Sequence, residues 1–463
     1  MKFTRSGLNE GSNYWRITLR YNRSDPSEKK DPSCEVIIIE KNKFQSFIAS
    51  GINLVEKGQI KSLEDAKLYD KEELLDLNIE IMEYTEVTEF EPKQNVLTIK
   101  LKENDGVSYV YYDYLILATG STQIKHGKSK NDDTRYISYK NYLESKKSLD
   151  TLNNSKNVVI VVAGFIGLEL ADSLDVEKNI TLVDRMDYPL FRYFDEKFIK
   201  IIYEKCPSNI EFQLNDAIYK IEEKTNGKLK VYFFNGDIKD DIDVIVSASN
   251  GKPNSELFID KIKLNYDKTV GVNSFLQTSA DNVYAIGDLV LQTLIDEDLP
   301  KNQFFLPLVS NAFKTALIAA ENILTGNTQK NIPTNKTIAT KFGKYYLASS
   351  GFTELDAISH FCEVDQITKE FFFENDESSD EGYLKIQLTF TKDAKQVVGA
   401  QILSVSRMAI ENINVLSMII REKLTFFEIM KLDFYFQPEI QPFINVVLQT
   451  ALSGIYENKT MNN

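Results

Sequence analysis

Histidine and cysteine are scarce in this chain, which has two histidines and three cysteines among 463 residues. Neither histidine, in KHGKSK or in AISHFC, lies in a motif that a Ser-His-Asp hydrolase or a histidine-ligated metal site requires. The cysteines, Cys34, Cys206 and Cys362, show neither disulfide pairing nor metal-ligand spacing, which favours a reducing compartment. The sequence therefore predicts no metal site and excludes a disulfide scaffold.

Positive charge and long apolar runs are lacking as well. Lysine and arginine total 54 against 68 acidic residues, a net charge of −14, whereas a protein that neutralises phosphates needs a basic surface. No apolar run reaches the length that crosses a bilayer, and the N-terminus, MKFTRSGLNEG, lacks the apolar core of a secretion signal. We expect a cytoplasmic protein with neither a nucleic-acid partner nor a membrane segment.

The pattern that is present is layered. The chain is too long for one hydrophobic core, and its length predicts about three domains. Short β-branched runs ending in Gly, Asp or Glu alternate with helix-like stretches, which is typical of parallel α/β layers. Beyond about residue 331 the pattern changes to strands joined by an acidic turn and then a longer helix, which indicates a separate α+β domain.

Residues 158–185, VVIVVAGFIGLELADSLDVEKNITLVDR, have the layout of a dinucleotide-binding βαβ unit. A strand leads to a turn with Gly164 and Gly167, a helix follows, and a second strand ends at Asp184. The glycines let the backbone approach a pyrophosphate at the helix N-terminus, and the acid accepts hydrogen bonds from ribose hydroxyls, which favours NADH. Val162 occupies the first glycine position, where a Cβ must fit a tight turn, so a βαβ unit that no longer binds nucleotide stays an alternative.

Two further strand ends, YDYLILATGS and TSADNVYAIGDLV, carry small and acidic residues. The first ends in Thr119 and Gly120, and the second in Gly287 and Asp288. A Gly-Asp step brings a backbone amide and a carboxylate to the ribityl and pyrophosphate region of a flavin, since glycine leaves room and the acid accepts a hydroxyl hydrogen bond. Because they lie on either side of the βαβ unit, the two strand ends together indicate a flavin site.

With these motifs the chain resembles the pyridine nucleotide-disulfide oxidoreductase family, specifically its branch of NADH oxidases, NADH peroxidases and coenzyme A-disulfide reductases. The resemblance extends nearly end to end and includes GKPNSEL, PLVSNA and LDFYFQPEIQPFINVVLQTAL, the last similar to that branch's dimer-forming domain. It implies an α/β fold with two Rossmann-like FAD- and NAD-binding domains and a C-terminal α+β dimerisation domain. The implied boundaries are 1–121 with 244–330 for the FAD domain, 122–243 for the NAD domain and 331–463 for the interface domain. It also implies FAD and NADH as cofactors, and a homodimer.

The redox position of this branch is altered here. In the branch the segment after the first acidic strand reads like SFLSCG, and its cysteine is the redox partner of the flavin. The matching segment is SFIASG, with Ser50 in the cysteine's place. An alcohol cannot form a sulfenate or attack a disulfide or peroxide as a thiolate does. The resemblance therefore excludes coenzyme A-disulfide reduction, peroxide reduction and the thiol-dependent route from oxygen to water.

The N-terminus also departs from the family pattern. The expected first strand is MKFTRS and the expected glycine turn is GLNEGS, in which Gly7 is retained and Ser12 occupies the last glycine position. Glu10 stands where family members often carry a histidine beside the flavin, and a carboxylate there would oppose an anionic reduced flavin. Glu40, which the resemblance makes the partner of the FAD ribose, is present.

The leading hypothesis is a flavoprotein NADH oxidase in which oxygen oxidises the flavin directly and hydrogen peroxide is released. The FAD contacts would come from Gly7, Glu40, Thr119, Gly120, Gly287 and Asp288, and the NADH contacts from Gly164, Gly167 and Asp184. The alternative is a non-catalytic family member with decayed nucleotide sites and a structural or interaction role. A third hypothesis, a cysteine-free reductase that passes electrons to a small redox protein, requires a partner with a neutral or basic docking face because this chain is acidic.

Overall fold

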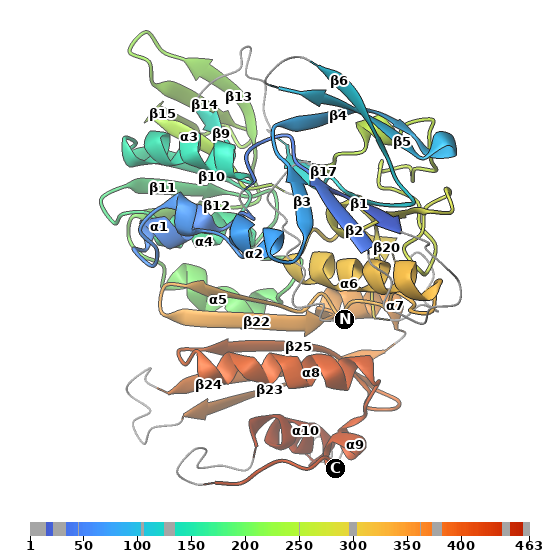
Figure 1. Ribbon diagram of the computed structural model, residues 1–463. Coiled ribbons are helices and arrows are strands. Elements are labelled where there is room, and N and C mark those ends of the chain that lie inside the picture. The colour runs from blue at the N-terminus through green and yellow to red at the C-terminus, as the bar shows by residue number, and fades with distance from the viewer. Residues whose placement is uncertain are drawn as a thin grey trace.

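Three five-stranded sheets organise the chain, and two of them lie side by side above the third (Figure 1). The computed structural model describes residues 15–21 (backbone only), 34–44, 46–102, 106–124, 135–249, 251–295, 303–361, 363–372, 382–437 and 445–456. The mixed α/β architecture predicted from the sequence is confirmed. Among the described residues, no helix is long and apolar enough to cross a membrane.

The second sheet along the chain is wholly parallel, with strand order β12–β11–β10–β16–β9. Its strands are β9 (Tyr136–Ile137), β10 (Asn157–Val161), β11 (Asn179–Val183), β12 (Ile210–Gln213) and β16 (Val244–Ser247). Val158 and Ile160 of β10 share a core with helices on one face, whereas Val159 and Val161 share another with a small antiparallel sheet on the other face. Burial on both faces explains why β10 reads as a continuous apolar run. The covering elements are α3 (Tyr142–Asn153), α4 (Phe165–Ser173), α5 (Glu196–Glu204), β13 (Ile218–Glu223), β14 (Leu229–Phe233) and β15 (Ile238–Ile242).

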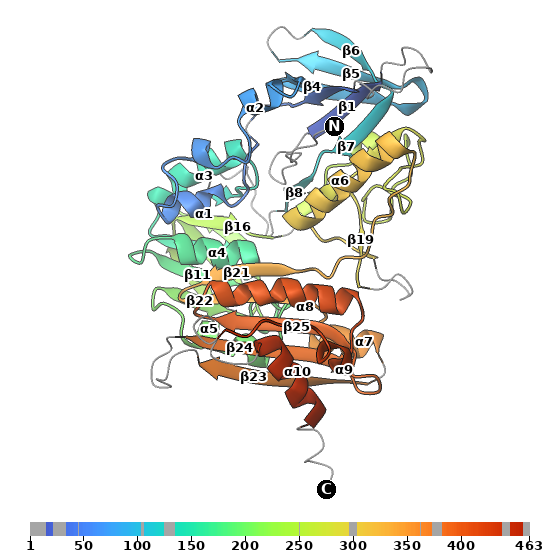
Figure 2. The same ribbon diagram turned by 60° about the horizontal axis from the view of Figure 1, so that its bottom comes forward.

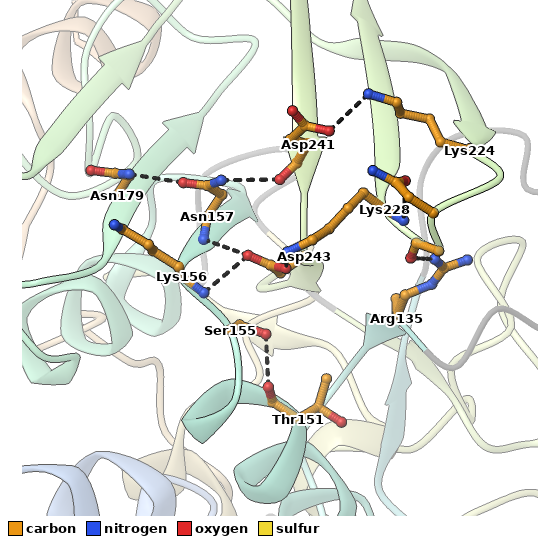
Figure 3. Close-up of polar contacts among 12 residues, drawn as sticks. Arg135, Thr151, Ser155, Lys156, Asn157, Asn179, Lys224, Lys228, Asp241 and Asp243 are labelled. Atoms are coloured by element: carbon orange, nitrogen blue, oxygen red, sulfur yellow. Dashed lines mark hydrogen bonds and ion pairs between the residues drawn. The ribbon is translucent and has the colours of Figure 1, made fainter.

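The amino edge of this sheet is fastened by a cluster of polar side chains (Figure 3). Asp243, just before β16, accepts hydrogen bonds from the backbone N–H groups of Lys156 (3.0 Å) and Asn157 (2.9 Å) and is ion-paired with Lys228. These hydrogen bonds and the lysine hold the pKa of Asp243 below its ordinary value, against the opposing effect of burial. The cluster ties the turn between β13 and β14 to the start of β10, at the end of the strand opposite the predicted nucleotide turn.

The first sheet has the order β18–β7–β1–β2–β3. Its strands are β1 (Trp15–Tyr21), β2 (Cys34–Ile39), β3 (Ile79–Met82), β7 (Tyr114–Ala118) and β18 (Val283–Ala285). All of them run in one direction except the central strand β1, which is antiparallel to both of its neighbours. Helix α6 (Val309–Thr325) and the antiparallel strands β4 (Thr85–Glu91), β5 (Val96–Leu101) and β6 (Val107–Tyr111) share this sheet's core.

The direction of β1 differs from the parallel first strand that the family pattern implies. Trp15 pairs with Ala118 and Tyr21 pairs with Cys34, so β1 begins at the edge of the sheet where β2 and β7 end. A parallel crossover of this length normally contains a helix whose apolar face covers the sheet. The connecting sequence, NRSDPSEKKDPS, has two prolines and no apolar residue, which suits an antiparallel connection instead. The predicted first strand and turn, residues 1–12, lie outside the described residues.

The third sheet is antiparallel, with order β21–β22–β25–β24–β23. Its strands are β21 (Ile338–Phe342), β22 (Tyr345–Gly351), β23 (Val364–Phe372), β24 (Tyr383–Thr391) and β25 (Val397–Ser404). One face carries α8 (Asn412–Arg421), α9 (Phe426–Ile429) and α10 (Val446–Tyr456), which come forward in Figure 2. The other face is turned toward α5 of the second sheet, and Leu347 and Leu403 on that face join the second sheet's core (Figure 1).

Candidate functional site

The predicted βαβ unit forms from β10, α4 and β11. Gly164 is the N-cap of α4, and a Cβ built there would meet nothing closer than a Val162 methyl carbon at 3.7 Å. At Gly167 a Cβ would lie 2.1 Å from the carbonyl oxygen of Val162, so no larger residue fits between helix and strand. Gly164 thus leaves room for close approach at the start of α4, and Gly167 allows close helix–strand packing, two roles that glycines have in dinucleotide-binding units.

Val162 has the backbone conformation of the glycine it replaces, with φ at +84°. The carboxylate of Asp184 lies against the same turn, because its Oδ2 accepts a hydrogen bond from the N–H of Ala163 (2.7 Å) and its Oδ1 accepts one from the N–H of Met186 (3.0 Å). Each carboxylate oxygen has a second lone pair that a ribose hydroxyl can use. The structure thus brings Asp184 and the glycine turn together.

Glu40 immediately follows β2 at the carboxyl edge of the first sheet and is 1% exposed. Its Oε1 accepts a hydrogen bond from the N–H of Asn42 (2.9 Å), but its Oε2 is buried and has no partner among the described residues. Burial raises the pKa of Glu40 to about 8, with a smaller contribution from the charge of Glu83. A buried acceptor without a donor is costly, and the hydroxyl of a bound ribose could supply a donor.

The two other predicted strand ends meet at the same edge. Gly120 and Gly287 both have positive φ, +64° and +61°, which glycine tolerates best. Ser121, directly after Gly120, donates a hydrogen bond to Oδ2 of Asp288 (2.5 Å), whereas Oδ1 of Asp288 is buried and has no partner in the part of the chain that the structure describes. Thr119 is buried, and its hydroxyl donates to the carbonyl of Asn254 (2.6 Å), which fixes the turn.

Two polar residues at this site were missed by the sequence analysis. Lys140, which precedes α3 of the second sheet, donates to Ser121 and is ion-paired with Asp288 (2.6 Å). Gln292 lies four residues beyond Asp288, is 1% exposed, and finds no partner within the described ranges for either end of its amide. Nothing local marks Lys140, because its contact joins residues 148 positions apart; a polar residue in the apolar stretch DLVLQTLI was the available signal for Gln292.

The described residues fit the two ends of FAD. Glu40 offers an unpaired acceptor where the adenosine ribose would lie, and Gly287 with Asp288 offers open backbone and an unpaired acceptor for the ribityl chain. Between these ends, β1 begins at this edge and runs away from it, so it is not the strand that the family pattern places before the pyrophosphate turn. Gly7 and Glu10 lie outside the described residues.

Ser50 is the N-cap of the short helix α1 (Gly51–Glu56) and is partly exposed. Its side chain makes no capping hydrogen bond, and its carbonyl accepts from the N–H groups of Asn53 and Leu54. Helix α1 packs against α3 and α4, and Lys57 just after it is ion-paired with Asp172 of α4 (2.6 Å). The backbone at Ser50, the position of the family's redox cysteine, is therefore fixed beside the second sheet, while the Ser50 hydroxyl does not cap the helix.

A family model described as "Pyridine nucleotide-disulphide oxidoreductase" matches residues 30–316. The chain belongs to this family. The match begins after β1, in agreement with the unusual N-terminus. By membership the chain is an FAD-dependent NAD(P)H oxidoreductase, a class whose cofactors are FAD and NAD(H).

Individual relatives agree with this assignment. The chain is 25% identical to an NADH oxidase of Enterococcus faecalis over 434 residues, covering 92% of this chain and 95% of the relative. It is 26% identical to the coenzyme A disulfide reductase of Staphylococcus haemolyticus over 347 residues, covering 72% and 73%. The solved water-forming NADH oxidase of Lactobacillus brevis superposes with a TM-score of 0.83 at 20% identity, covering 92% of this chain and 94% of that one. The family resemblance predicted from the motifs is confirmed.

Proposed function

We propose that the protein is a flavoprotein NADH oxidase that releases hydrogen peroxide, with the balance NADH + H⁺ + O₂ → NAD⁺ + H₂O₂. The observation that supports this most is the pair of acidic side chains at the flavin edge, Glu40 and Asp288, each with one buried oxygen that receives no hydrogen bond from the described residues. Buried acceptors normally receive a hydrogen bond, so two unpaired acceptors at the predicted ends of the FAD site favour binding of a ligand that carries hydroxyl groups. Bound FAD would accept hydride from NADH and pass the electrons to oxygen.

The chain's own residues then have separate tasks. Glu40 would accept a hydrogen bond from the adenosine ribose, and Asp288 would accept one from the ribityl chain while Lys140 neutralises its charge. On the second sheet, Gly164 presents the N-terminus of α4 to the NADH pyrophosphate, and Asp184 accepts from the ribose hydroxyls. Because residue 50 is serine and carries no thiol, the reduction of oxygen stops at its two-electron product, hydrogen peroxide.

The deciding experiment is the visible absorbance spectrum of the purified protein before and after anaerobic addition of NADH. We expect a flavin spectrum that bleaches, followed on readmission of air by one peroxide for each NADH consumed. A colourless protein that takes up no added FAD would contradict the proposal.

Variants of Ser50 test the role of the missing thiol. Because the hydroxyl makes no capping hydrogen bond, Ser50→Ala should leave NADH oxidation and peroxide yield unchanged. Ser50→Cys should lower the peroxide yield per NADH, since a thiolate there can reduce peroxide. Loss of activity in Ser50→Ala would show that the serine itself takes part in the reaction.

A second candidate is a non-catalytic family member with a structural or interaction role. The reversed direction of β1 favours it, because no described strand delivers the chain to a pyrophosphate-binding turn at the flavin edge. This candidate predicts that the second sheet still binds NAD⁺ or binds nothing, and that FAD does not bind. Equilibrium dialysis with FAD separates the two candidates.

We also propose a homodimer formed by the C-terminal region, which acts on NADH and oxygen in the cytoplasm without nucleic acid or membrane. Helices α8 and α9 and the chain beyond them expose large apolar side chains, including Phe427 (50% exposed) and Phe436 (64% exposed). Sedimentation equilibrium should give about twice the chain mass, and Phe436→Glu should shift it toward the monomer.

We place the domain boundaries at 1–121 with 248–330 for the FAD domain, 122–247 for the NAD domain and 331–463 for the interface domain. The second FAD segment starts at 248 rather than 244 because β16 (Val244–Ser247) pairs with β10 of the second sheet.

A further inference from the structure

The nucleotide turn of the second sheet is held by a segment that reaches the third sheet. This connecting loop, residues 185–194, runs from Asp184 at the end of β11 to Asp195, the N-cap of α5. Its length and lack of regular structure would allow it to move unless specific contacts fix it. At its far end, next to α5, several hydrogen bonds join Asp195 to the C-terminal region.

Asp195 is the centre of these contacts. Its Oδ2 accepts hydrogen bonds from three glutamine amides of the third sheet, Gln366 (2.7 Å), Gln387 (2.6 Å) and Gln401 (2.5 Å). Its Oδ1 accepts from the N–H of Glu354, the first residue of α7 (Glu354–His360), at 2.9 Å, and its own N–H donates to Gln401 Oε1 at 3.0 Å. The glutamines come from β23, β24 and β25, three neighbouring strands on the face turned to α5. A carboxylate that accepts four hydrogen bonds is strongly fixed.

A lysine of the third sheet's approach segment makes a second anchor. Lys336 is 6% exposed, donates to the carbonyl of Arg192 (2.9 Å) and is ion-paired with Asp356 of α7 (2.5 Å). Its ammonium lies 5.8 Å from the ring centre of Tyr193, and that ring is 4.7 Å from the ring of Phe165, the first residue of α4. The loop is therefore held from the third sheet and in turn supports the start of the nucleotide helix.

The near end of the loop grips the turn itself. Asp184 accepts from the N–H of Ala163, and Leu190 donates its N–H to the carbonyl of Ala163 (3.0 Å). The N–H and C=O of Ala163 are thus hydrogen-bonded to Asp184 and to Leu190 of the loop, and Ala163 lies between Val162, with its positive φ, and Gly164. A change in the position of the loop must move the turn on which a pyrophosphate would lie.

We propose that Asp195 is a positioning residue for the nicotinamide nucleotide: by binding the glutamines of the third sheet it fixes the connecting loop and, through the loop, the turn at Val162–Gly164. The inference rests on the proposed function for the identity of the ligand, but the fixing of the turn is a property of the protein alone. It gives the C-terminal region a part in nucleotide binding as well as in assembly.

Hydrogen exchange on the full-length protein tests the fixing of the turn directly, because the amides of Ala163 and Leu190 are protected by the contacts in question. Asp195→Ala should make both amides exchange at least tenfold faster and should weaken NAD⁺ binding, measured by calorimetry, about tenfold. Asp195→Asn keeps one acceptor oxygen for these donors, so it should restore part of the protection that Asp195→Ala loses. The control is Asp243→Ala, which removes another carboxylate that accepts several hydrogen bonds, at the opposite end of β10 (Figure 3).

The outcomes distinguish a failure of the inference about Asp195 from a failure of the proposed function. Unchanged exchange at Ala163 and Leu190 in Asp195→Ala overturns the inference, as does an equal effect from Asp243→Ala. If Asp195→Ala does not fold, Gln387→Leu, which removes one donor of the three, should give a smaller change in the same two amides. A wild-type protein that binds no NAD⁺ contradicts the proposed function, while the exchange data still decide whether Asp195 fixes the turn.

Discussion

Replacing Val162 with glycine should leave the stability of the protein almost unchanged, although it deletes a partly buried isopropyl group. Val162 has φ at +84°, and an L-residue in the left-handed region costs about 1–2 kcal/mol, which glycine relieves. Against this, half-burial of a valine side chain contributes about 1 kcal/mol, and the extra backbone freedom of glycine costs about 0.5–1 kcal/mol. The two sides balance to within about 1 kcal/mol.

The matched control is Val161→Gly, one residue earlier in the regular strand β10, where the side chain is 8% exposed and no strain is relieved. We expect that substitution to cost about 3–4 kcal/mol, from lost burial, the cavity and the glycine backbone together. Urea denaturation of both variants, followed by circular dichroism, gives the comparison. Equal losses in the two variants would refute the argument that position 162 carries backbone strain. In Val162→Gly the turn also loses its Cβ, so NAD⁺ binding should strengthen.

Three further predictions concern buried polar groups. Burial raises the pKa of Glu40 to about 8, so the folded chain keeps this proton up to about pH 8, whereas the unfolded chain releases it near the ordinary pKa of 4.5. Between these two pH values the free energy of unfolding should fall by up to about 1.4 kcal/mol per pH unit. Glu40→Gln should flatten this slope in denaturant titrations of nucleotide-free protein at pH 5 and 7.5, and an unaltered slope would contradict the prediction. Gln292→Leu should raise the melting temperature of nucleotide-free protein, because a buried amide without partners costs about 1–3 kcal/mol; a lower melting temperature would mean that the amide is satisfied. Lys178→Met should destabilise the protein by about 1–3 kcal/mol, since the Lys178 ammonium donates to the carbonyls of Leu152 (2.9 Å) and Ser155 (2.7 Å) at the end of α3; no loss in urea titrations would show that water replaces it.

Local patterns in the sequence were enough for the second sheet. The glycine spacing, the apolar run of β10 and the acid that follows β11 all lie within 28 residues, and each acts through neighbours in that unit, so the βαβ layout around Gly164, Gly167 and Asp184 could be predicted. Their contacts with a nucleotide stay a prediction. The meeting of the Thr-Gly and Gly-Asp strand ends also followed from the pattern, because carboxyl ends of parallel strands share an edge.

Contacts between distant segments were beyond the sequence. Lys140 reaches Asp288 across 148 positions, and Asp195 reaches three glutamines at least 171 positions away, none of which lies in a motif. The direction of β1 was missed for a different reason: a strand pairs in either direction with the same apolar alternation, and the connection decides which. The polar sequence of that connection, with its two prolines, was the available signal.

The central position of β1 has a consequence for the handling of this protein. A chain that lost its first 21 residues to proteolysis would keep the pairs β18–β7 and β2–β3 but would leave β7 and β2 with unpaired N–H and C=O groups along the whole gap between them. Unprotected strand edges recruit strands from other molecules. Clipping near the N-terminus should therefore appear first as precipitation, well before any loss of the C-terminal sheet, and the integrity of those few residues decides whether a preparation remains in solution.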